Sequence, residues 1–409
     1  MTHPPARPLW RGRALALIGI VLLAFSLRSA VASLSPLYDH IARDFALPST
    51  VIGLIGTVPP LCYAVFGLVA PGFERRFGLE RSTITALAII TLGLVARAAA
   101  PNAGALLAAS ALVFAGIGVG NVLLPALVKK YLPDRIGLMT TIYSTMMAIS
   151  TFVPPLVAVP FADATDWHLS VGVWAVFALS AMVPWIVQAI RERANPVDVD
   201  LEEASPRMLG RMWRLWTPWA LIVSFVATSS TAYISFAWLP TILVEVAGVT
   251  PHDAGLLLSL FAFMGLPTSL VVPVLVARFR MIIPLWTLAA ALGLAGALGL
   301  LFAPTLAPWL WVACLGLVPL LFPAVLTLVG ARTRTHDATV ALSSFVQSVG
   351  YGITTFTPVG VGLIHDASGD WTAALVFIGI ISALAFPAGF IIARPGTVED
   401  EWERRYGRW

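Results

Sequence analysis

A single arginine lies inside a long apolar stretch close to the N-terminus. The stretch LALIGIVLLAFSLRSAVASLSPLY is long enough to cross a bilayer, and Arg28 stands well within it. An arginine at the centre of a bilayer costs about 2.5–3.5 kcal/mol on insertion scales, so it needs a compensating role. Because its planar guanidinium donates paired hydrogen bonds, Arg28 is a candidate anchor for a small anion. A structural arginine bonded to backbone carbonyls is the alternative.

The direction of the side chain favours the anchor. Helical side chains lean toward the N-terminus of their own helix. If the N-terminus is cytoplasmic, this lean carries Arg28 toward the middle of the membrane, which argues against snorkelling to the nearer outer surface. Its neighbours at helical spacing are mostly small: Ala24, Val31, Ala32 and Ser35. Arg97 differs, because it lies near the outer end of its own stretch, where we expect snorkelling or interface packing.

Four further large polar side chains lie in apolar stretches and need hydrogen-bond partners there. They are Asn121, Tyr143, Gln347 and Tyr351. We expect them to orient a bound substrate, with an interhelical hydrogen bond as the alternative for Asn121. Trp238 is a candidate apolar wall. It ends a stripe at helical spacing formed by Ser224, Thr228, Thr231 and Ser235. Such hydroxyls often bond only to backbone or to a neighbouring helix.

Several kinds of chemistry are missing from the sequence. No Asp or Glu lies deep in an apolar stretch, so a proton relay is not visible. We find no nucleophile–base pair and no metal-ligand spacing, and the two cysteines, Cys62 and Cys314, lie far apart in apolar runs. We therefore expect no enzyme activity, no cofactor and no metal site. The net charge of +4 on few charged residues does not indicate nucleic acid binding.

The composition predicts an all-α polytopic membrane protein. Hydrophobic residues make up 58% of the 409 residues and charged residues only 11%, far below the roughly 25% of soluble domains. Apolar runs of membrane-spanning length predict twelve transmembrane helices. They lie near 14–37, 50–71, 83–100, 104–128, 138–162, 168–190, 217–243, 253–276, 281–302, 308–330, 339–363 and 371–393.

The basic residues orient these predicted helices. With the N-terminus inside, 22 of the 25 Lys and Arg residues fall in cytoplasmic segments, and the outer loops hold only Arg43. This asymmetry predicts cytoplasmic N- and C-termini in a bacterial inner membrane. The first run also has features of a cleaved signal peptide, with Arg11 and Arg13 before it and AVA at Ala30–Ala32. Cleavage is disfavoured, because the two halves of the chain repeat each other and the repeat requires this run as a membrane helix.

The two halves of the chain form an internal sequence repeat. Residues about 200 positions apart match, including Gly53 and Gly255, Pro71 and Pro273, Arg76 and Arg278, and Trp167 and Trp371. Six helices per half would give both copies the same orientation, with a substrate site at their interface near mid-membrane. We predict a six-helix half over 1–190, a cytoplasmic linker over 191–216, a second six-helix half over 217–393 and a cytoplasmic tail over 394–409.

Two segments carry a resemblance to a known family. LRSAVASLSPL (27–37) and GIGVGNVLLPALVKKYLPDRIGLMTTIY (116–143) resemble the cyanate/nitroimidazole-transporter branch of the major facilitator superfamily. The glycines of the second segment predict close helix packing, because no strand precedes them as a nucleotide-binding loop would require. The resemblance implies two six-helix halves and a secondary transporter that works by alternating access, with cyanate-like or nitroimidazole-like substrates.

The sequence thus predicts a transporter for a small anion or an electron-rich polar solute. We expect its partners to be that small molecule and the lipid bilayer, and we expect it to act as a monomer. One alternative is efflux of larger amphipathic compounds, for which Arg28 would be structural. Another is a transporter-like binding or sensor protein without net flux.

Overall fold

The computed structural model describes residues 13–192 and 206–409. Residues 1–12 and most of the predicted linker, 193–205, lie outside the described residues. All regular structure in the described part is helical, which confirms the predicted all-α fold. The chain forms two compact units. The first runs up to Ala46 and resumes at Val65, and the second holds Leu47–Ala64 and the residues from Glu202 onward. The boundaries predicted from sequence, at 190 and 217, stay a prediction.

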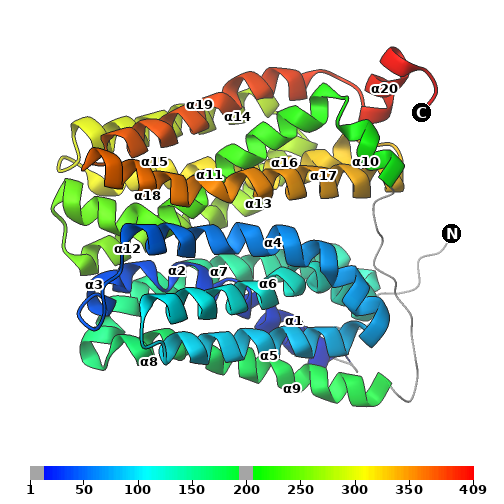
Figure 1. Ribbon diagram of the computed structural model, residues 1–409. Coiled ribbons are helices and arrows are strands. Elements are labelled where there is room, and N and C mark those ends of the chain that lie inside the picture. The colour runs from blue at the N-terminus through cyan, green and yellow to red at the C-terminus, as the bar shows by residue number, and fades with distance from the viewer. Residues whose placement is uncertain (1–12, 193–205) are drawn as a thin grey trace. The chain divides into compact units, whose positions relative to one another are not determined.

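The first unit is built from nine helices, one of them shared, and two 3-10 turns within the described residues (Figure 1). They are α1 (Ala14–Ser26), α2 (Ser29–Ala32), η1 (Ser35–Leu37), α3 (Tyr38–Ile41), the second part of α4 (Ser49–Phe77), α5 (Leu79–Ala98), α6 (Ala103–Tyr131), η2 (Pro133–Arg135), α7 (Ile136–Ala164), α8 (Trp167–Gly172) and α9 (Trp174–Glu192).

The first predicted span is not one helix. It is divided into α1, α2, η1 and α3, with breaks at Leu27–Arg28 and after Ala32. Pro36 explains the second break, because its ring excludes the carbonyl of Ala32 and it lacks the N–H that would bond there. The stretch is also rich in serine, whose side chain competes with helical backbone bonds.

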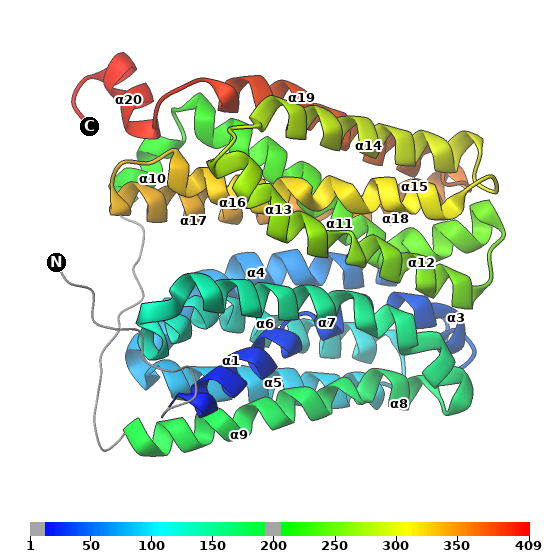
Figure 2. The same cartoon turned by 180° about the vertical axis from the view of Figure 1, so that it is seen from behind.

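Glycines let the helices of the first unit approach closely. A Cβ on Gly116 of α6 would stand 2.7 Å from the Ala86 carbonyl oxygen of α5, and one on Gly120 would stand 2.6 Å from the Leu27 side chain. No larger residue fits either contact without displacing its neighbour. These contacts confirm that Gly116 and Gly120 serve helix packing. In Figure 2, α1, α5 and α9 run side by side in this unit.

The second unit begins with the first part of α4 and continues with the rest of the chain (Figure 2). Its further elements are α10 (Pro206–Met212), α11 (Trp216–Ala247), α12 (Pro251–Phe263), α13 (Gly265–Ala277), α14 (Ile282–Phe302), α15 (Pro308–Leu317), η3 (Val318–Leu320), α16 (Leu321–Ala331), α17 (His336–Thr354), α18 (Phe356–Ser368), α19 (Thr372–Ala393) and α20 (Val398–Tyr406).

Eleven helices or helix pairs among the described residues are long and apolar enough to cross a membrane. The remaining predicted span, 339–363, corresponds to α17 and α18, which are divided at Thr355. This span is not among the eleven because the many polar residues of α17 lower its mean hydropathy. Large apolar side chains such as Leu92 and Phe302 stand exposed on the helices, as expected where the solvent is lipid.

One end of each unit carries the same kind of arrangement. In the first unit, Trp167 Nε1 donates to Asp44 Oδ2 over 2.6 Å, and the His168 ring stacks on that indole. In the second unit, Trp371 Nε1 donates to Glu245 Oε2 over 2.7 Å, and the His365 ring stacks on it. The pair of tryptophans that matched in sequence thus has matching partners in space.

Candidate functional site

Arg28 stands at the break in the first membrane helix. It lies between α1 and α2 with φ −125° and ψ −23°, and its side chain is half-buried. The backbone there changes from helical bonds to the tighter bonds Arg28 N to Phe25 O and Val31 N to Arg28 O. A break at membrane depth is tolerated only where protein or a water-filled cavity surrounds it. The predicted anchor therefore lies at the point where the helix gives up its own hydrogen bonds.

Three serine hydroxyls near Arg28 lack a hydrogen-bond partner within the described residues. They belong to Ser29, Ser33 and Ser35, and all three residues are buried. Ser26, in the regular helix before the break, shows the usual alternative, since its Oγ donates to Leu22 O over 2.9 Å. The break removes such carbonyls, so the hydroxyls stay able to donate to a ligand or water.

Arg97 supports this broken segment from α5. Its Nη1 donates to Ala30 O over 3.0 Å, its Nε donates to Ser110 Oγ over 2.9 Å, and its guanidinium lies over the Phe114 ring. The residue is only 1% exposed, so the expectation of snorkelling is wrong. A carbonyl freed by the break thus receives its hydrogen bond from a buried cation on a different helix.

The other predicted site residues of the first unit flank the same region. Asn121 is half-buried on α6, directly after Gly120, which packs against Leu27 beside Arg28. The structure thus brings Asn121 and Arg28 to the same level of the unit. Tyr143 is half-buried on α7, which packs against both α1 and α2.

The second unit gathers three tyrosines. Tyr351 of α17 stands edge-to-face with Tyr63 of α4, with ring centroids 5.7 Å apart, and with Tyr233 of α11 at 6.4 Å. Tyr63 and Tyr233 are themselves 6.4 Å apart. Each residue is buried, so each phenol hydroxyl is expected to have a hydrogen-bond partner. Gln347 lies one turn before Tyr351, is half-buried, and donates from Nε2 to Ser343 Oγ over 2.9 Å.

Trp238 contacts a different set of residues from the three tyrosines. Its Nε1 donates to Pro358 O over 2.8 Å, and its ring packs against Trp371 and beneath Gly362. The hydroxyl stripe that precedes it on α11 is also buried. Ser224 and Thr231 donate to the carbonyls four residues earlier, and Ser224 accepts from Trp286 Nε1. These contacts favour a packing role for Trp238, Ser224 and Thr231, whereas the buried Ser235 Oγ has no partner in the described residues.

The side chains of the described residues also bear on whether the chain could hold a metal ion. No group of three or more His, Cys, Asp and Glu that could hold a metal ion occurs in residues 13–192 and 206–409. Near Arg28 in the chain, the serine hydroxyls without a partner in the described residues are hydrogen-bond donors.

The sequence matches the Major Facilitator Superfamily over residues 17–355. The chain belongs to this superfamily. Its members and the relatives found here are membrane transporters rather than enzymes, as the sequence predicted.

Three relatives from bacteria align with most of the chain. An uncharacterized transporter of Bacillus subtilis, YycB, is 32% identical over 88% of this chain and 89% of its own length. The 2-nitroimidazole transporter of Escherichia coli is 29% identical over 94% of this chain and 96% of its own length. The cyanate transport protein CynX of Escherichia coli is 24% identical over 89% and 95%. The resemblance stated from the two sequence segments is thereby confirmed.

Solved structures support the fold. A bacterial homologue of the human lysosomal transporter Spinster, crystallised inward-facing and unoccupied, gives a TM-score of 0.72 at 14% identity, covering 93% of this chain and 96% of that one. Its occupied inward-facing form also gives 0.72, at 16% identity and coverage of 97% and 99%. At this identity the likeness shows the shared fold.

Sequence reasoning missed three residues. Tyr63 and Tyr233 were overlooked although they are large polar side chains in apolar stretches, the criterion that selected Tyr351. Arg97 was assigned to the surface because its position near Pro101 gave no sign of distant partners. Only the fold brings Ala30 and Ser110 to its guanidinium.

Proposed function

We propose that this transporter moves a small anion or an electron-rich polar solute, cyanate-like or nitroimidazole-like, across the bacterial inner membrane by alternating access. Its termini would lie in the cytoplasm, and it would work as a monomer. The relatives named for 2-nitroimidazole and cyanate support the substrate class. The positive charges of the cytoplasmic segments support the orientation.

The break at Arg28 carries this proposal. Next to Arg28 in the chain, the hydroxyls of Ser29, Ser33 and Ser35 are buried and have no partner in the described residues. In hydrocarbon a hydroxyl is costly to bury unless a hydrogen bond satisfies it. A small anion would accept from Arg28 and from a serine hydroxyl together, and a nitro group offers two oxygens with the same spacing as a carboxylate. The site would therefore select ligands by their acceptors.

The other residues would orient the substrate. Asn121 and Tyr143 stand on α6 and α7 beside the broken helix of the first unit. Gln347 and Tyr351 would contribute from the second unit, with Tyr63 and Tyr233 holding the Tyr351 ring. Trp238, expected from sequence as an apolar wall, would serve to pack α11 against α18.

A ligand-panel thermal shift on the purified protein tests the proposal. The panel holds cyanate, nitrate, small carboxylates, 2-nitroimidazole and several lipophilic cations, applied to wild type, Arg28→Gln and Arg43→Gln. Arg43 is the matched control, because it is exposed in the loop after the first span. A ligand at 100 times its Kd stabilises the protein by about 2.7 kcal/mol. We expect an anion or nitro compound to stabilise wild type and Arg43→Gln but not Arg28→Gln.

Two outcomes would contradict the proposal. If Arg28→Gln folds and responds to the same anion as wild type does, Arg28 is structural. Alternatively, only the lipophilic cations stabilise the wild type, which would favour efflux of amphipathic compounds. Binding of an anion without counterflow in vesicles would point to the sensor alternative.

A further inference from the structure

The C-terminal helix α20 packs against one end of the second unit. In both views it stands beside α10 at the end of the unit where α11 begins (Figures 1 and 2). Its own start is fixed by a capping box, in which Thr397 Oγ1 accepts from Asp400 N and Asp400 Oδ2 accepts from Thr397 N. Val398 is fully buried and its N–H donates to Arg332 O over 2.9 Å. The start of α20 is therefore held against the second unit by a backbone hydrogen bond and a buried side chain.

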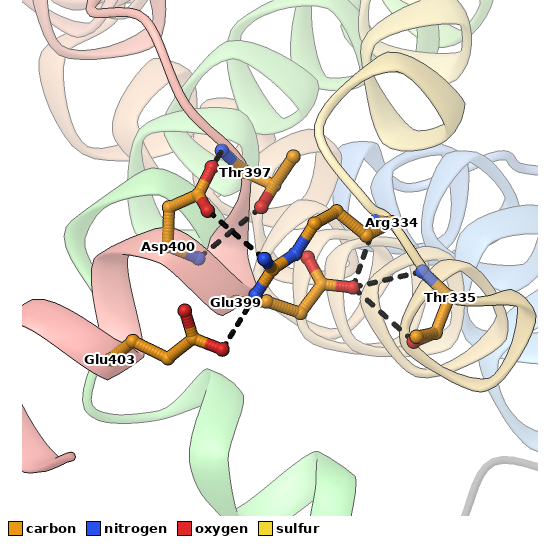
Figure 3. Close-up of polar contacts among 6 residues, drawn as sticks. All are labelled: Arg334, Thr335, Thr397, Glu399, Asp400 and Glu403. Atoms are coloured by element: carbon orange, nitrogen blue, oxygen red, sulfur yellow. Dashed lines mark hydrogen bonds and ion pairs between the residues drawn. The ribbon is translucent and has the colours of Figure 1, made fainter. Parts of the chain in front are cut away.

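One carboxylate of α20 caps the start of α17. Glu399 Oε1 accepts from the N–H groups of Arg334 and Thr335 over 2.8 and 3.0 Å, and from Thr335 Oγ1 over 3.2 Å (Figure 3). Glu399 is completely buried. The N–H groups and the positive end of the helix dipole at this position stabilise the charge through Oε1, whereas the buried Oε2 has no partner in the described residues.

A second carboxylate, two residues along, caps the start of α11. Glu401 Oε1 accepts from Trp216 N over 2.8 Å, and its Oε2 accepts from Thr217 N over 3.2 Å. Glu401 is 7% exposed. α11 has no side-chain cap of its own, since Leu215 occupies the N-cap position. One short helix thus supplies the cap of α11 and adds to that of α17, whose own N-cap residue, Thr335, accepts from Ala338 N through its Oγ1.

A cation completes the arrangement at the end of α19. Arg332 follows α16, and its Nη1 donates to Gly396 O over 2.8 Å while its Nη2 donates to Ile392 O. This places a positive charge on the last carbonyls of α19, the end of a helix that favours cations. The chain just before α20 is thereby tied to the loop that leads into α17.

An aromatic seam continues from these caps along α11 and α17. Trp219 stands edge-on to Phe345 with centroids 5.9 Å apart, and Phe225 stands edge-on to Tyr351 at 4.9 Å. Gly350 allows the approach, since a Cβ there would lie 2.4 Å from the Phe225 ring. Tyr233 then meets Tyr351 at 6.4 Å. The seam leads from the capped ends to the residues that we propose for substrate orientation.

We propose that Glu399 and Glu401 are positioning residues of the transport site, which fix the register of α17 against α11 and so place Gln347 and Tyr351. This inference rests on the proposed function, because it assigns those two residues to the substrate. Sliding of α17 along α11 by one turn, about 5.4 Å, would break the bonds of one carboxylate while α20 held the other. Because interlocked rings have few alternative packings, the register is transmitted along the seam.

The test combines hydrogen exchange with transport in the full-length protein. The variants are Glu399→Ala, Glu401→Ala and the milder Glu399→Gln, whose amide oxygen still accepts. Glu403→Ala is the matched control on the same helix, because Glu403 only pairs with the exposed Arg334 side chain over 2.7 Å. We expect amide exchange over 343–355 to rise at least tenfold in the two alanine variants, less in Glu399→Gln, and not at all in Glu403→Ala.

The transport readout separates positioning from stability. In proteoliposomes, the KM for cyanate or 2-nitroimidazole should rise at least threefold in the alanine variants, with Glu399→Gln partly restoring it. Faster exchange confined to α20 and to the first turns of α11 and α17, with 343–355 unchanged, would overturn the inference and make the carboxylates local caps. If wild type transports neither probe, the substrate proposal fails, and the exchange pattern still decides the role of α20.

Discussion

The first helices of the two halves predicted from sequence are built differently. In the second unit, α11 runs without a break from Trp216 to Ala247 and is capped by Glu401. In the first unit the corresponding span is divided into α1, α2, η1 and α3 around Arg28. The fold does not require the break, because the second unit also forms a helical bundle although α11 is continuous.

The hydroxyl groups of the two helices distinguish them less than their backbones do. On α11, Ser224 and Thr231 donate to carbonyls one turn earlier, and Ser224 also accepts from Trp286. On the broken helix, Ser29, Ser33 and Ser35 have no such bond in the described residues. On α11, Ser230 and Ser235 also have buried hydroxyls without a partner in the described residues, so the two helices differ chiefly in the continuity of their backbone.

The largest effect is expected from removing the support of the broken helix. Arg97→Met would leave Ala30 O and Ser110 without their buried charged donor. Hydrogen bonds to charged groups are worth about 1.5–3 kcal/mol, so we expect a loss of about 3 kcal/mol, measured by thermal unfolding in detergent. Trp311→Phe in the second unit removes a neutral bond to Ala303 O and should cost about 1 kcal/mol. Equal losses would mean that the break needs no special support.

A smaller and symmetric effect is expected at the ends of the units that carry the paired tryptophans. Trp167→Phe removes the bond to Asp44, and Trp371→Phe removes the bond to Glu245. Both carboxylates are exposed, so each change should lower the free energy of unfolding by only about 1 kcal/mol. Chemical denaturation of the two variants should give equal losses. A several-fold difference would show that the units differ at these ends as well as in their first helices.

The smallest effect concerns acid and α20. Donation from the Thr397 backbone and hydroxyl lowers the pKa of Asp400 below its ordinary 3.8, with Arg334 and Arg404 nearby. A lowered folded pKa contributes stability above the ordinary value, and this contribution is lost as pH falls through the lowered one. The unfolding temperature of wild type should therefore exceed that of Asp400→Asn at pH 6, and the gap should shrink as the pH falls below about 4.

The control for this prediction lies in the first unit. Asp134 receives a hydrogen bond from Arg13, which lowers the pKa of that carboxyl too. Asp134→Asn should lose its gap to wild type in acid in the same way, without any effect on α20. A gap for Asp400→Asn that stays constant from pH 6 to acid would contradict the assignment of Asp400 to the cap.

Much of the fold was predictable because hydropathy and charge act locally along the chain. Eleven of the predicted spans were found as helices, and the remaining one was lost to the break at Thr355 and the polar face of α17. The paired tryptophans of the repeat have matching carboxylate partners. The role of the stripe that ends at Trp238 stays a prediction, because a shared helical face does not say whether it faces a cavity or another helix.

Arg28 and Arg97 show what the sequence alone determines and what only the tertiary structure decides. The sequence by itself determined that this chain lives in lipid, because some twenty consecutive apolar residues can only be satisfied as a membrane helix. It also determined that two arginines had to be explained. Only the tertiary structure decided that Arg97 is a buried brace, because its partners, Ala30 and Ser110, come from other helices. Long-range hydrogen bonds of this kind leave no periodic trace in the sequence.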